Sequence, residues 1–176
     1  MVNLENIILR LKEHGTDEDK LEDVLKSYTI AEDIHKNQFR QSGEPYIIHP
    51  LNVAKNLLDM EIYDTDTICA ALLHDTIEDS DSTYEEIKDL FGEEVAKIVD
   101  GVTKINRLKF NSDSEQMAAN QRKILVGLSE DVRVIFIKLA DRLHNMRTIW
   151  VHPDNIQKEK AKETLEILAP IAHRLG

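Results

Sequence analysis

The sequence predicts an all-α protein. Apolar residues recur at spacings of three and four along most of the chain, as in Ile7, Ile8 and Leu11, which is the spacing of amphipathic helices. The alternation of apolar and polar residues that marks a half-buried strand is hard to find. A length of 176 residues suits one domain with a substantial core. We therefore expect residues 1–176 to fold as a single compact bundle of helices.

Each helix is expected where this periodicity meets a start or stop signal. The expected ranges are 3–13, 17–39, 50–59, 65–79, 83–90, 92–104, 114–129, 131–149 and 155–174. The range 131–149 begins with an apolar run that would also suit a buried strand. That run continues through Leu139 and Ala140 and is too long for one, so we interpret it as a buried helix.

Three local patterns refine these boundaries. Pro50 suits the first position of a helix, where its missing N–H costs nothing, and this leaves His49 on the preceding cap or turn. Thr83 followed by Glu86 predicts a capping box. The segment 104–120 is polar at its centre and predicts a mobile loop before the next helix.

The composition excludes several classes of partner and compartment. With 22 basic and 33 acidic residues the formal charge is −11, which argues against binding nucleic acid or an anionic membrane. The N-terminus resembles neither a signal peptide nor a membrane span. Cys69 is the single cysteine, so no intramolecular disulfide is possible and a reducing compartment is indicated. We expect a cytoplasmic protein, and a small phosphorylated ligand remains compatible with this charge.

The stretch ALLHDTIEDS, residues 71–80, sets ionisable groups against an apolar run. On a continuous helix, His74 and Glu78 would form one row and Asp75 and Asp79 another. An acid-rich helix end is usually solvated, and this alternative explains Glu78 and Asp79 alone. A His-Asp pair directly after an apolar helix is costly to bury unless a cation lies between its side chains, and imidazole and carboxylate are ordinary metal ligands.

Two further residues lie beside apolar segments and could complete a metal site. His49 precedes a predicted helix, and Asp141 lies in the buried helix 131–149. Each has an ordinary alternative: His49 as a helix cap, and Asp141 in a salt bridge with Lys138 or Arg142. Because several segments offer a ligand at once, a metal centre is favoured over separate structural roles.

The order of these motifs resembles a known family. The segments HKNQFRQSGEPYIIHPLNVA, TICAALLHDTIEDSDSTYEEIKDLFGEEVAKIVDGVTKI, IKLADRLHNMRTI and KETLEILAPIAHRLG resemble the HD superfamily of metal-dependent phosphohydrolases. Within it they are most similar to the N-terminal hydrolase domain of Rel/SpoT-type alarmone (ppGpp) synthetase/hydrolase enzymes. The resemblance covers nearly all of residues 30–176 and implies a compact multi-helix HD-domain bundle.

The resemblance also implies the roles of the site residues. One divalent ion, typically manganese (Mn²⁺) in this family, would be held by His49, His74, Asp75 and Asp141. Glu78 and Asp79 match the acidic pair that activates or positions the attacking water. The residues that match nucleotide contacts are Arg40 against the guanine, Asn145 and Thr148 near the nucleoside, and, more weakly, Ser42 and Tyr46. His144 is expected to support the site without binding the ion.

The chain departs from the family pattern at one position. The family commonly has lysine where this sequence has Gln41, so one positive charge near the expected nucleotide is missing. A partly exposed charge contact contributes about 1 kcal/mol, so the departure concerns affinity more than chemistry. Lys138, Arg142 and Arg147 are the candidates to compensate.

The implied function is metal-dependent hydrolysis of guanosine tetraphosphate or pentaphosphate to GDP or GTP and pyrophosphate. In long members of the family a synthetase domain follows, so the chain is also compatible with being the N-terminal part of a bifunctional enzyme. Three alternatives stay open at this point. They are an HD phosphohydrolase of another nucleotide, a non-catalytic regulatory HD domain, and a structural helical module without a metal.

Overall fold

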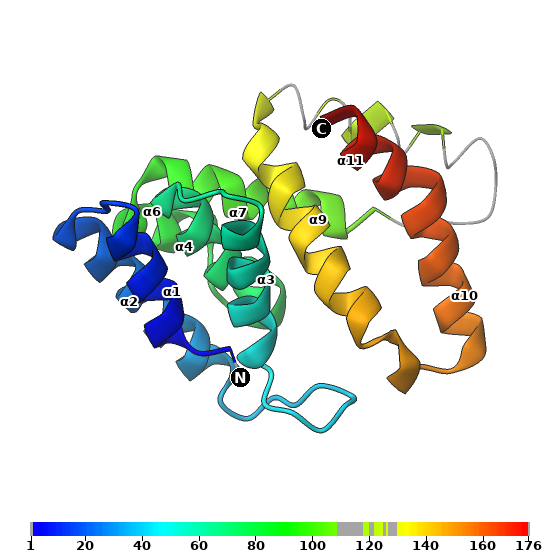
Figure 1. Cartoon of the computed structure of the whole chain (residues 1–176), viewed down its shortest axis with the longest axis horizontal. Coiled ribbons are helices and arrows are strands. Elements are labelled where there is room, and N and C mark those ends of the chain that lie inside the picture. The colour runs from blue at the N-terminus through cyan, green and yellow to red at the C-terminus, as the bar shows by residue number, and fades with distance from the viewer. Residues whose placement is uncertain (1, 109–117, 120–121, 125, 127–129, 176) are drawn as a thin grey trace.

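The computed structural model describes residues 2–108, 118–119, 122–124, 126 and 130–175. In these ranges the regular secondary structure is helical, apart from one isolated antiparallel bridge between Phe39 and Pro45. The all-α prediction is therefore confirmed (Figure 1). Within the same ranges, every helix is too short or too polar to cross a lipid bilayer.

The described helices follow one another in the order of the chain. They are α1 Leu4–Glu13, α2 Glu18–His35, α3 Ile48–Asp59, α4 Thr65–Leu73, α5 Thr76–Asp79, α6 Tyr84–Phe91, α7 Glu93–Asn106, α9 Val132–Arg147, η1 Ile149–Val151, α10 Asp154–Glu163, η2 Thr164–Leu168 and α11 Ala169–Leu175. The turn η1 is a 3₁₀ helix, and η2 is a π-helical stretch that joins α10 to α11. The helix expected over 114–129 and the end of the loop expected within 104–120 lie largely outside the described residues.

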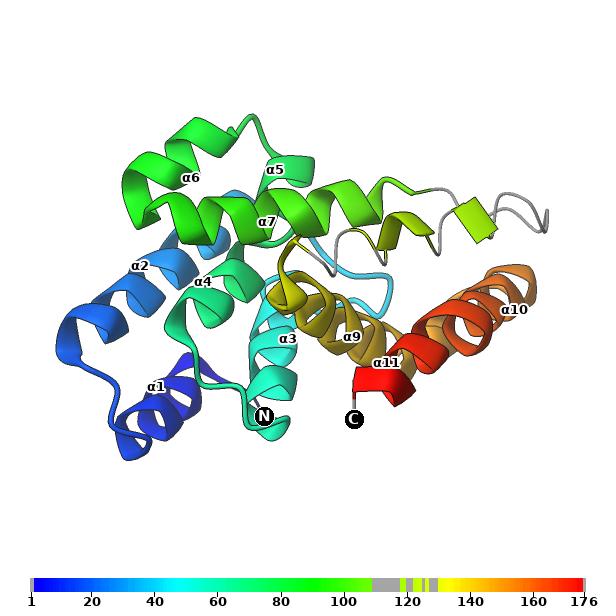
Figure 2. The ribbon, with the colours of Figure 1, turned by 90° about the horizontal axis from the view of Figure 1, so that it is seen from above.

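Helix α4 forms the centre of the bundle. It packs against α2, α3 and α7, and every residue from Thr67 to Leu73 is buried. A helix that is apolar on all sides belongs in the interior of a protein. Figure 2 shows α4 enclosed by these neighbours, and Figure 1 shows α9 between the N-terminal helices and the rod formed by α10 and α11.

Helices α7 and α9 approach each other closely where Gly101 meets Val134. A Cβ atom at Gly101 would lie 2.7 Å from Val134 Cγ2, so any larger residue at this crossing would force the Val134 side chain or its helix to move. The crossing matters for function because it brings the C-terminal end of α7 beside the middle of α9.

Helix α2 ends at His35, earlier than the expected residue 39. The following residues form a tight loop in which Arg40 N–H donates to Glu44 O at 2.8 Å and Gly43 N–H donates to Arg40 O at 2.9 Å. Gly43 has a φ of 86°, a left-handed conformation that favours glycine. The Ser-Gly-Glu-Pro sequence therefore forms a turn.

Helix α3 begins at Ile48, so the expectation that His49 precedes the helix is wrong. His49 lies in the first turn and Pro50 is the third helical residue. Proline is tolerated here because the first four N–H groups of a helix have no intrahelical partner. The histidine is thereby held by a helix and not by a flexible turn.

The single helix expected over 65–79 is also wrong, because the chain breaks into α4 and α5 at His74 and Asp75. His74 Nδ1 lies 2.7 Å from Ala71 O, and the Thr76 hydroxyl donates to Leu73 O at 2.7 Å. Side chains that bond the carbonyl groups of the last turn compete with continuation of the helix. His74 and Asp75 consequently lie at a junction and not in two rows along one helix.

The remaining boundaries agree more closely with expectation. Helix α9 is helical as predicted, but it ends at Arg147 and is followed by η1, so the helix expected to continue through 149 stops earlier. The capping box is confirmed: Thr83 accepts from Glu86 N–H, and the Glu86 carboxylate accepts from Thr83 N–H. The helix expected over 155–174 corresponds to α10, η2 and α11.

Candidate active site

A cavity of about 510 Å³ opens where the loop after α2 meets α3, α5, α7, α9 and α10. Its walls include His49, Asp75, Glu78 and Asp141. These side chains come from segments far apart in the sequence, so the cavity is a product of the tertiary fold.

Three buried side chains converge at the base of this cavity. They are His49, His74 and Asp141, here called the metal group. Each offers one ligand atom, and these atoms lie within 4.8 Å of one another. His49 Nε2 is 3.2 Å from Asp141 Oδ1. Two imidazoles and a carboxylate at this spacing could hold a divalent metal ion.

The hydrogen bonds of the histidines favour this interpretation. His74 Nδ1 faces Ala71 O at 2.7 Å, and because a carbonyl only accepts, Nδ1 must carry a proton. His74 Nε2 is buried and forms no hydrogen bond of good geometry among the described residues, although Asp75 Oδ2 lies 3.1 Å away. Backbone or side-chain bonds at one ring nitrogen commonly orient the other toward a metal. His49 Nδ1 similarly lies 2.8 Å from His144 Nδ1, so His144 supports His49 from behind.

Asp75 lies beside the group of three. Its Oδ2 atom is 3.1 Å from His74 Nε2 and 3.7 Å from His49 Nε2. The same oxygen accepts a 2.6 Å hydrogen bond from the Tyr46 hydroxyl. All four residues expected as ligands therefore lie in one neighbourhood, with Asp75 nearest the loop side.

Burial and mutual charge shift the pKa values of these groups. Burial alone would lower the pKa of His74, but the Asp75 carboxylate outweighs it and raises the pKa to about 9. Burial opposes ionisation of Asp141, yet the Lys138 ammonium and His49 hold its pKa well below the usual range. A metal ion would take the place of the proton that His74 otherwise retains, because metal ligands must be deprotonated.

Glu78 and Asp79 occupy different positions although they are adjacent in α5. Glu78 lines the cavity and accepts a 2.9 Å hydrogen bond from Asn106 Nδ2. Asp79 points elsewhere, with Oδ2 3.7 Å from the buried His35 Nδ1. Burial, followed by the nearby Asp75 carboxylate, raises the pKa of both carboxyl groups. Glu78 is thus the better placed of the two to act on a ligand in the cavity.

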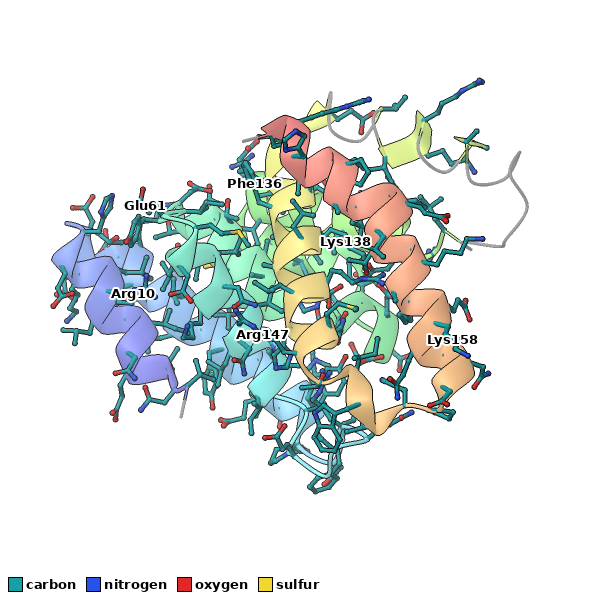
Figure 3. The ribbon with its side chains drawn as sticks, turned by 45° about the vertical axis from the view of Figure 1, so that its right-hand side comes forward. Arg10, Glu61, Phe136, Lys138, Arg147 and Lys158 are labelled. Carbon is teal, nitrogen blue, oxygen red and sulfur yellow. The ribbon has the colours of Figure 1, made fainter. Side chains whose placement is uncertain are left out.

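Lys138 reaches the cavity from α9, on the side that faces α10 (Figure 3). Its ammonium donates to Asp141 Oδ2 at 2.9 Å and to Asn106 Oδ1 at 2.7 Å. The salt bridge considered as an alternative for Asp141 does form, but it coexists with the approach of Asp141 to His49. Asn106 was not singled out from the sequence, where an isolated asparagine at a helix end carries no distinctive signal.

The residues expected to contact a nucleotide line a second cavity of about 360 Å³. They are Arg40, Ser42, Tyr46, Asn145 and Thr148. The two cavities share part of their walls, including Arg40, Tyr46 and Lys138. The two cavities therefore adjoin one another, and His49 and Asp141 of the metal group line the larger one.

Arg40 is held against α9 at the boundary of the two cavities. Its guanidinium donates to Asn145 Oδ1 at 3.0 Å and to Thr148 Oγ1 at 3.2 Å. Asn145 Nδ2 in turn donates to Asp141 Oδ1 at 2.6 Å. One polar chain thus connects the loop after α2 to a candidate metal ligand.

The candidates to replace the charge missing at Gln41 differ in their surroundings. Arg142 forms a buried ion pair with Glu163, and Arg147 donates to Asn56 Oδ1 on the α3 side of α9 (Figure 3). Lys138 and Arg142 both line the two cavities, and Lys138 is likewise paired with a buried carboxylate, that of Asp141. Arg147 lines neither cavity, so Lys138 and Arg142 are the better placed to face a bound anion.

The fold and the site together define a family. The HD domain family matches residues 27–176, and the chain belongs to it. Among curated relatives, a guanosine-3′,5′-bis(diphosphate) 3′-pyrophosphohydrolase of Aquifex aeolicus is 51% identical over 174 residues, covering 99% of this chain and 24% of the relative. The bifunctional (p)ppGpp synthase/hydrolase SpoT of Escherichia coli is 49% identical over 160 residues, covering 90% and 22%.

Two further relatives extend this comparison. A GTP pyrophosphokinase of Brucella melitensis is 50% identical over 151 residues, which are 86% of this chain and 20% of the relative. A solved structure described as a metazoan ortholog of SpoT that hydrolyses ppGpp has a TM-score of 0.62 and 28% identity, and the match covers 81% of this chain and 80% of that one. The chain spans about a quarter of the length of the curated relatives it matches.

Proposed function

We propose that this chain hydrolyses guanosine 3′,5′-bispyrophosphate, both tetraphosphate and pentaphosphate, at the 3′ position. The products are GDP or GTP and pyrophosphate, and the activity serves the stringent response. The observation that carries the proposal is the buried group of His49, His74 and Asp141, two of which line the same cavity as Glu78. The names of the relatives support the choice of substrate.

The resident ion is proposed to be Mn²⁺, held by His49, His74, Asp75 and Asp141. A mixed set of two imidazoles and two carboxylates suits a borderline-to-hard divalent cation. When bound, such an ion lowers the pKa of a water molecule and offsets charge on a phosphoryl oxygen. Asp75 and Asp141 carry the negative charge that keeps the ion in place.

Glu78 is proposed to accept the proton of the attacking water. It lines the cavity, it lies on a short helix that begins next to Asp75, and its raised pKa brings it closer to the range in which a general base works. Asp79 is proposed to assist by orienting the water or Glu78. As the new P–O bond forms, the bond between that phosphorus and the ribose 3′ oxygen breaks, so the pyrophosphate carries the oxygen of the attacking water. The 3′ oxygen of GDP or GTP gains a proton, which balances the one that Glu78 accepts.

Arg40, Asn145 and Thr148 are proposed to bind the nucleoside in the second cavity, with help from Ser42 and Tyr46. A planar guanidinium suits stacking on a purine as well as contact with phosphate. Arg40 is already oriented by its bonds to Asn145 and Thr148. Pre-orientation of this kind reduces the entropy lost when a ligand binds.

We also propose what surrounds this domain: its neighbouring domains, its location in the cell and its partners. The greater length of the relatives supports a longer full-length protein with further domains, among them a synthetase domain. A cytoplasmic location is supported by Cys69, which is buried and unpaired in the structure. Nucleic acid and membrane are not expected as partners because of the acidic composition.

The test is release of pyrophosphate from guanosine tetraphosphate by the purified chain with Mn²⁺. We expect turnover that disappears in Asp75→Ala and persists in Asp59→Ala, a matched control whose carboxylate pairs with Arg10 and Lys55 away from the cavity. Absence of release from the folded, metal-loaded chain without substitutions, here called the parent chain, would contradict the proposal. The search would then move to other phosphorylated substrates.

A further inference from the structure

A single amide connects three helices inside the cavity. Asn106, the last residue of α7, accepts a 2.7 Å hydrogen bond from Lys138 Nζ of α9. Its Nδ2 atom donates a 2.9 Å hydrogen bond to Glu78 Oε1 of α5. Lys138 continues the chain to Asp141 Oδ2 at 2.9 Å. Glu78 and the metal group are thus joined by consecutive hydrogen bonds.

The orientation of this amide follows from its neighbours. An ammonium only donates, so it must face the amide oxygen, and a carboxylate only accepts, so it must face the amide nitrogen. Asn106 therefore has one favourable orientation, with its oxygen toward Lys138 and its nitrogen toward Glu78. A carboxylate or an apolar side chain could not serve both neighbours.

Glu78 needs such a partner because its own helix does little to hold it. Helix α5 has four residues, and the glutamate side chain has three rotatable bonds that are costly to order. Among the described residues, the hydrogen bond from Asn106 is the one that Glu78 accepts, and it involves Oε1. The second oxygen, Oε2, stays available for a ligand in the cavity.

We propose that Asn106 is a positioning residue that fixes Glu78 relative to the metal group by way of Lys138. The proposal rests on the role of Glu78 in the proposed function. Asn106 itself touches neither substrate nor ion in this scheme. Its contribution is to select the Glu78 rotamer in which one oxygen is anchored and the other faces the reacting centre.

A simpler role for Asn106 would be to tie α7 to α9 for stability. Two substitutions separate the possibilities. Asn106→Ala removes both hydrogen bonds, whereas Asn106→Asp keeps the shape and the acceptor for Lys138 but loses the donor to Glu78. If stability were the whole role, the aspartate would replace the asparagine without loss of turnover.

The first measurement is steady-state hydrolysis at saturating Mn²⁺, together with bound metal and the melting temperature. We expect both variants to lose about tenfold to a hundredfold in kcat, as misplacement of a reacting group does. KM should stay within about threefold and bound metal should match the parent. Asn56→Ala is the matched control, because Asn56 also bridges two helices, donating to Ala140 O and accepting from Arg147, without lining the cavity. It should lower the melting temperature and keep kcat.

The second measurement needs neither metal nor turnover. In a nitrogen-15 NMR spectrum of the metal-free chain, Glu78→Gln should shift the side-chain amide signal of Asn106 and leave that of Asn56 unchanged. An unshifted Asn106 signal would overturn the proposal.

The outcomes are distinct from those that test the proposed function. Unchanged kcat in both Asn106 variants of an active parent, or loss of metal in either, would overturn the positioning role alone. An inactive parent chain would overturn the proposed function, and the role of Asn106 in catalysis with it.

Discussion

The Tyr46 hydroxyl donates a 2.6 Å hydrogen bond to Asp75 Oδ2, so the loop after α2 is attached directly to a candidate metal ligand. Burial and the Asp75 carboxylate raise the pKa of the Tyr46 phenol, which keeps it a donor at neutral pH. The tyrosine ring also packs against the buried His35, with ring centroids 4.6 Å apart. Tyr46 is therefore held by two contacts, one through its ring and one through its hydroxyl.

Tyr46→Phe should weaken metal binding. Loss of a hydrogen bond to a ligand typically lowers metal affinity by about tenfold to a hundredfold, and we expect the lower end because the other three ligands are untouched. Titration with Mn²⁺ measures the effect. Tyr28→Phe is the control, since the Tyr28 hydroxyl bonds the exposed Glu32. Equal affinity in Tyr46→Phe and the parent would show that this hydroxyl does not support the ion.

Asp75→Ala and Glu78→Ala should separate metal binding from turnover. Asp75→Ala removes a ligand, so bound metal and activity should both disappear. Glu78→Ala should keep the metal and lose turnover, because the Glu78 side chain is hydrogen-bonded to Asn106 and not to a candidate ligand. Metal content of the two purified variants decides the matter, and a metal-free Glu78→Ala protein would break the assignment.

Gln41→Lys should lower KM. Gln41 is exposed and lines the second cavity, so a lysine there adds a positive charge near the proposed nucleotide. A partly exposed charge contact contributes up to about 1 kcal/mol, which corresponds to a several-fold decrease in KM that shrinks as salt is added. Asn37→Lys adds the same charge to an exposed position outside both cavities. A similar decrease in that variant would point to general electrostatics.

Asp131→Ala should destabilise the fold in a pH-dependent manner. Asp131 caps α9 by accepting from Arg133 N–H, and loss of such a cap costs about 1 kcal/mol. Burial acts to raise the pKa of Asp131, but its hydrogen bonds with Arg133 outweigh this and lower the pKa. A lowered pKa in the folded state stabilises the protein above the unfolded pKa of about 3.9, and this stabilisation is lost as pH falls further.

Urea unfolding at pH 7 and at pH 3 tests this expectation. The difference between the parent and Asp131→Ala should be full at pH 7 and smaller at pH 3. Asp131→Asn keeps a capping oxygen without the charge, so its deficit should be smaller than that of the alanine variant at pH 7. A deficit that is the same at both pH values would mean that the charge of Asp131 contributes nothing.

The sequence allowed much of the fold to be predicted because apolar periodicity depends on burial. The buried helix through Asp141 and the cap at Thr83 follow from patterns that are local in the chain. The break at His74 does not, because it depends on side chains that bond the carbonyls of the preceding turn, a competition that periodicity cannot register.

The same distinction applies to the candidate site. His49 and Asp75 could be singled out because ionisable residues beside apolar runs require an explanation, and the resemblance supplied their roles. Asn106 could not, because its importance comes from the crossing of α7 and α9, which brings together residues that are distant in the chain.

His49 and Asp141, whose side-chain atoms approach to 3.2 Å, stand at opposite ends of a long intervening segment of the sequence. Closing a long loop costs chain entropy before the contact can form, and contacts of this kind slow folding. The two side chains therefore cannot meet in a partly folded chain that lacks either α3 or α9. During synthesis the site must appear late, once α9 has emerged, and binding of an ion would report that α3, α4 and α9 have docked.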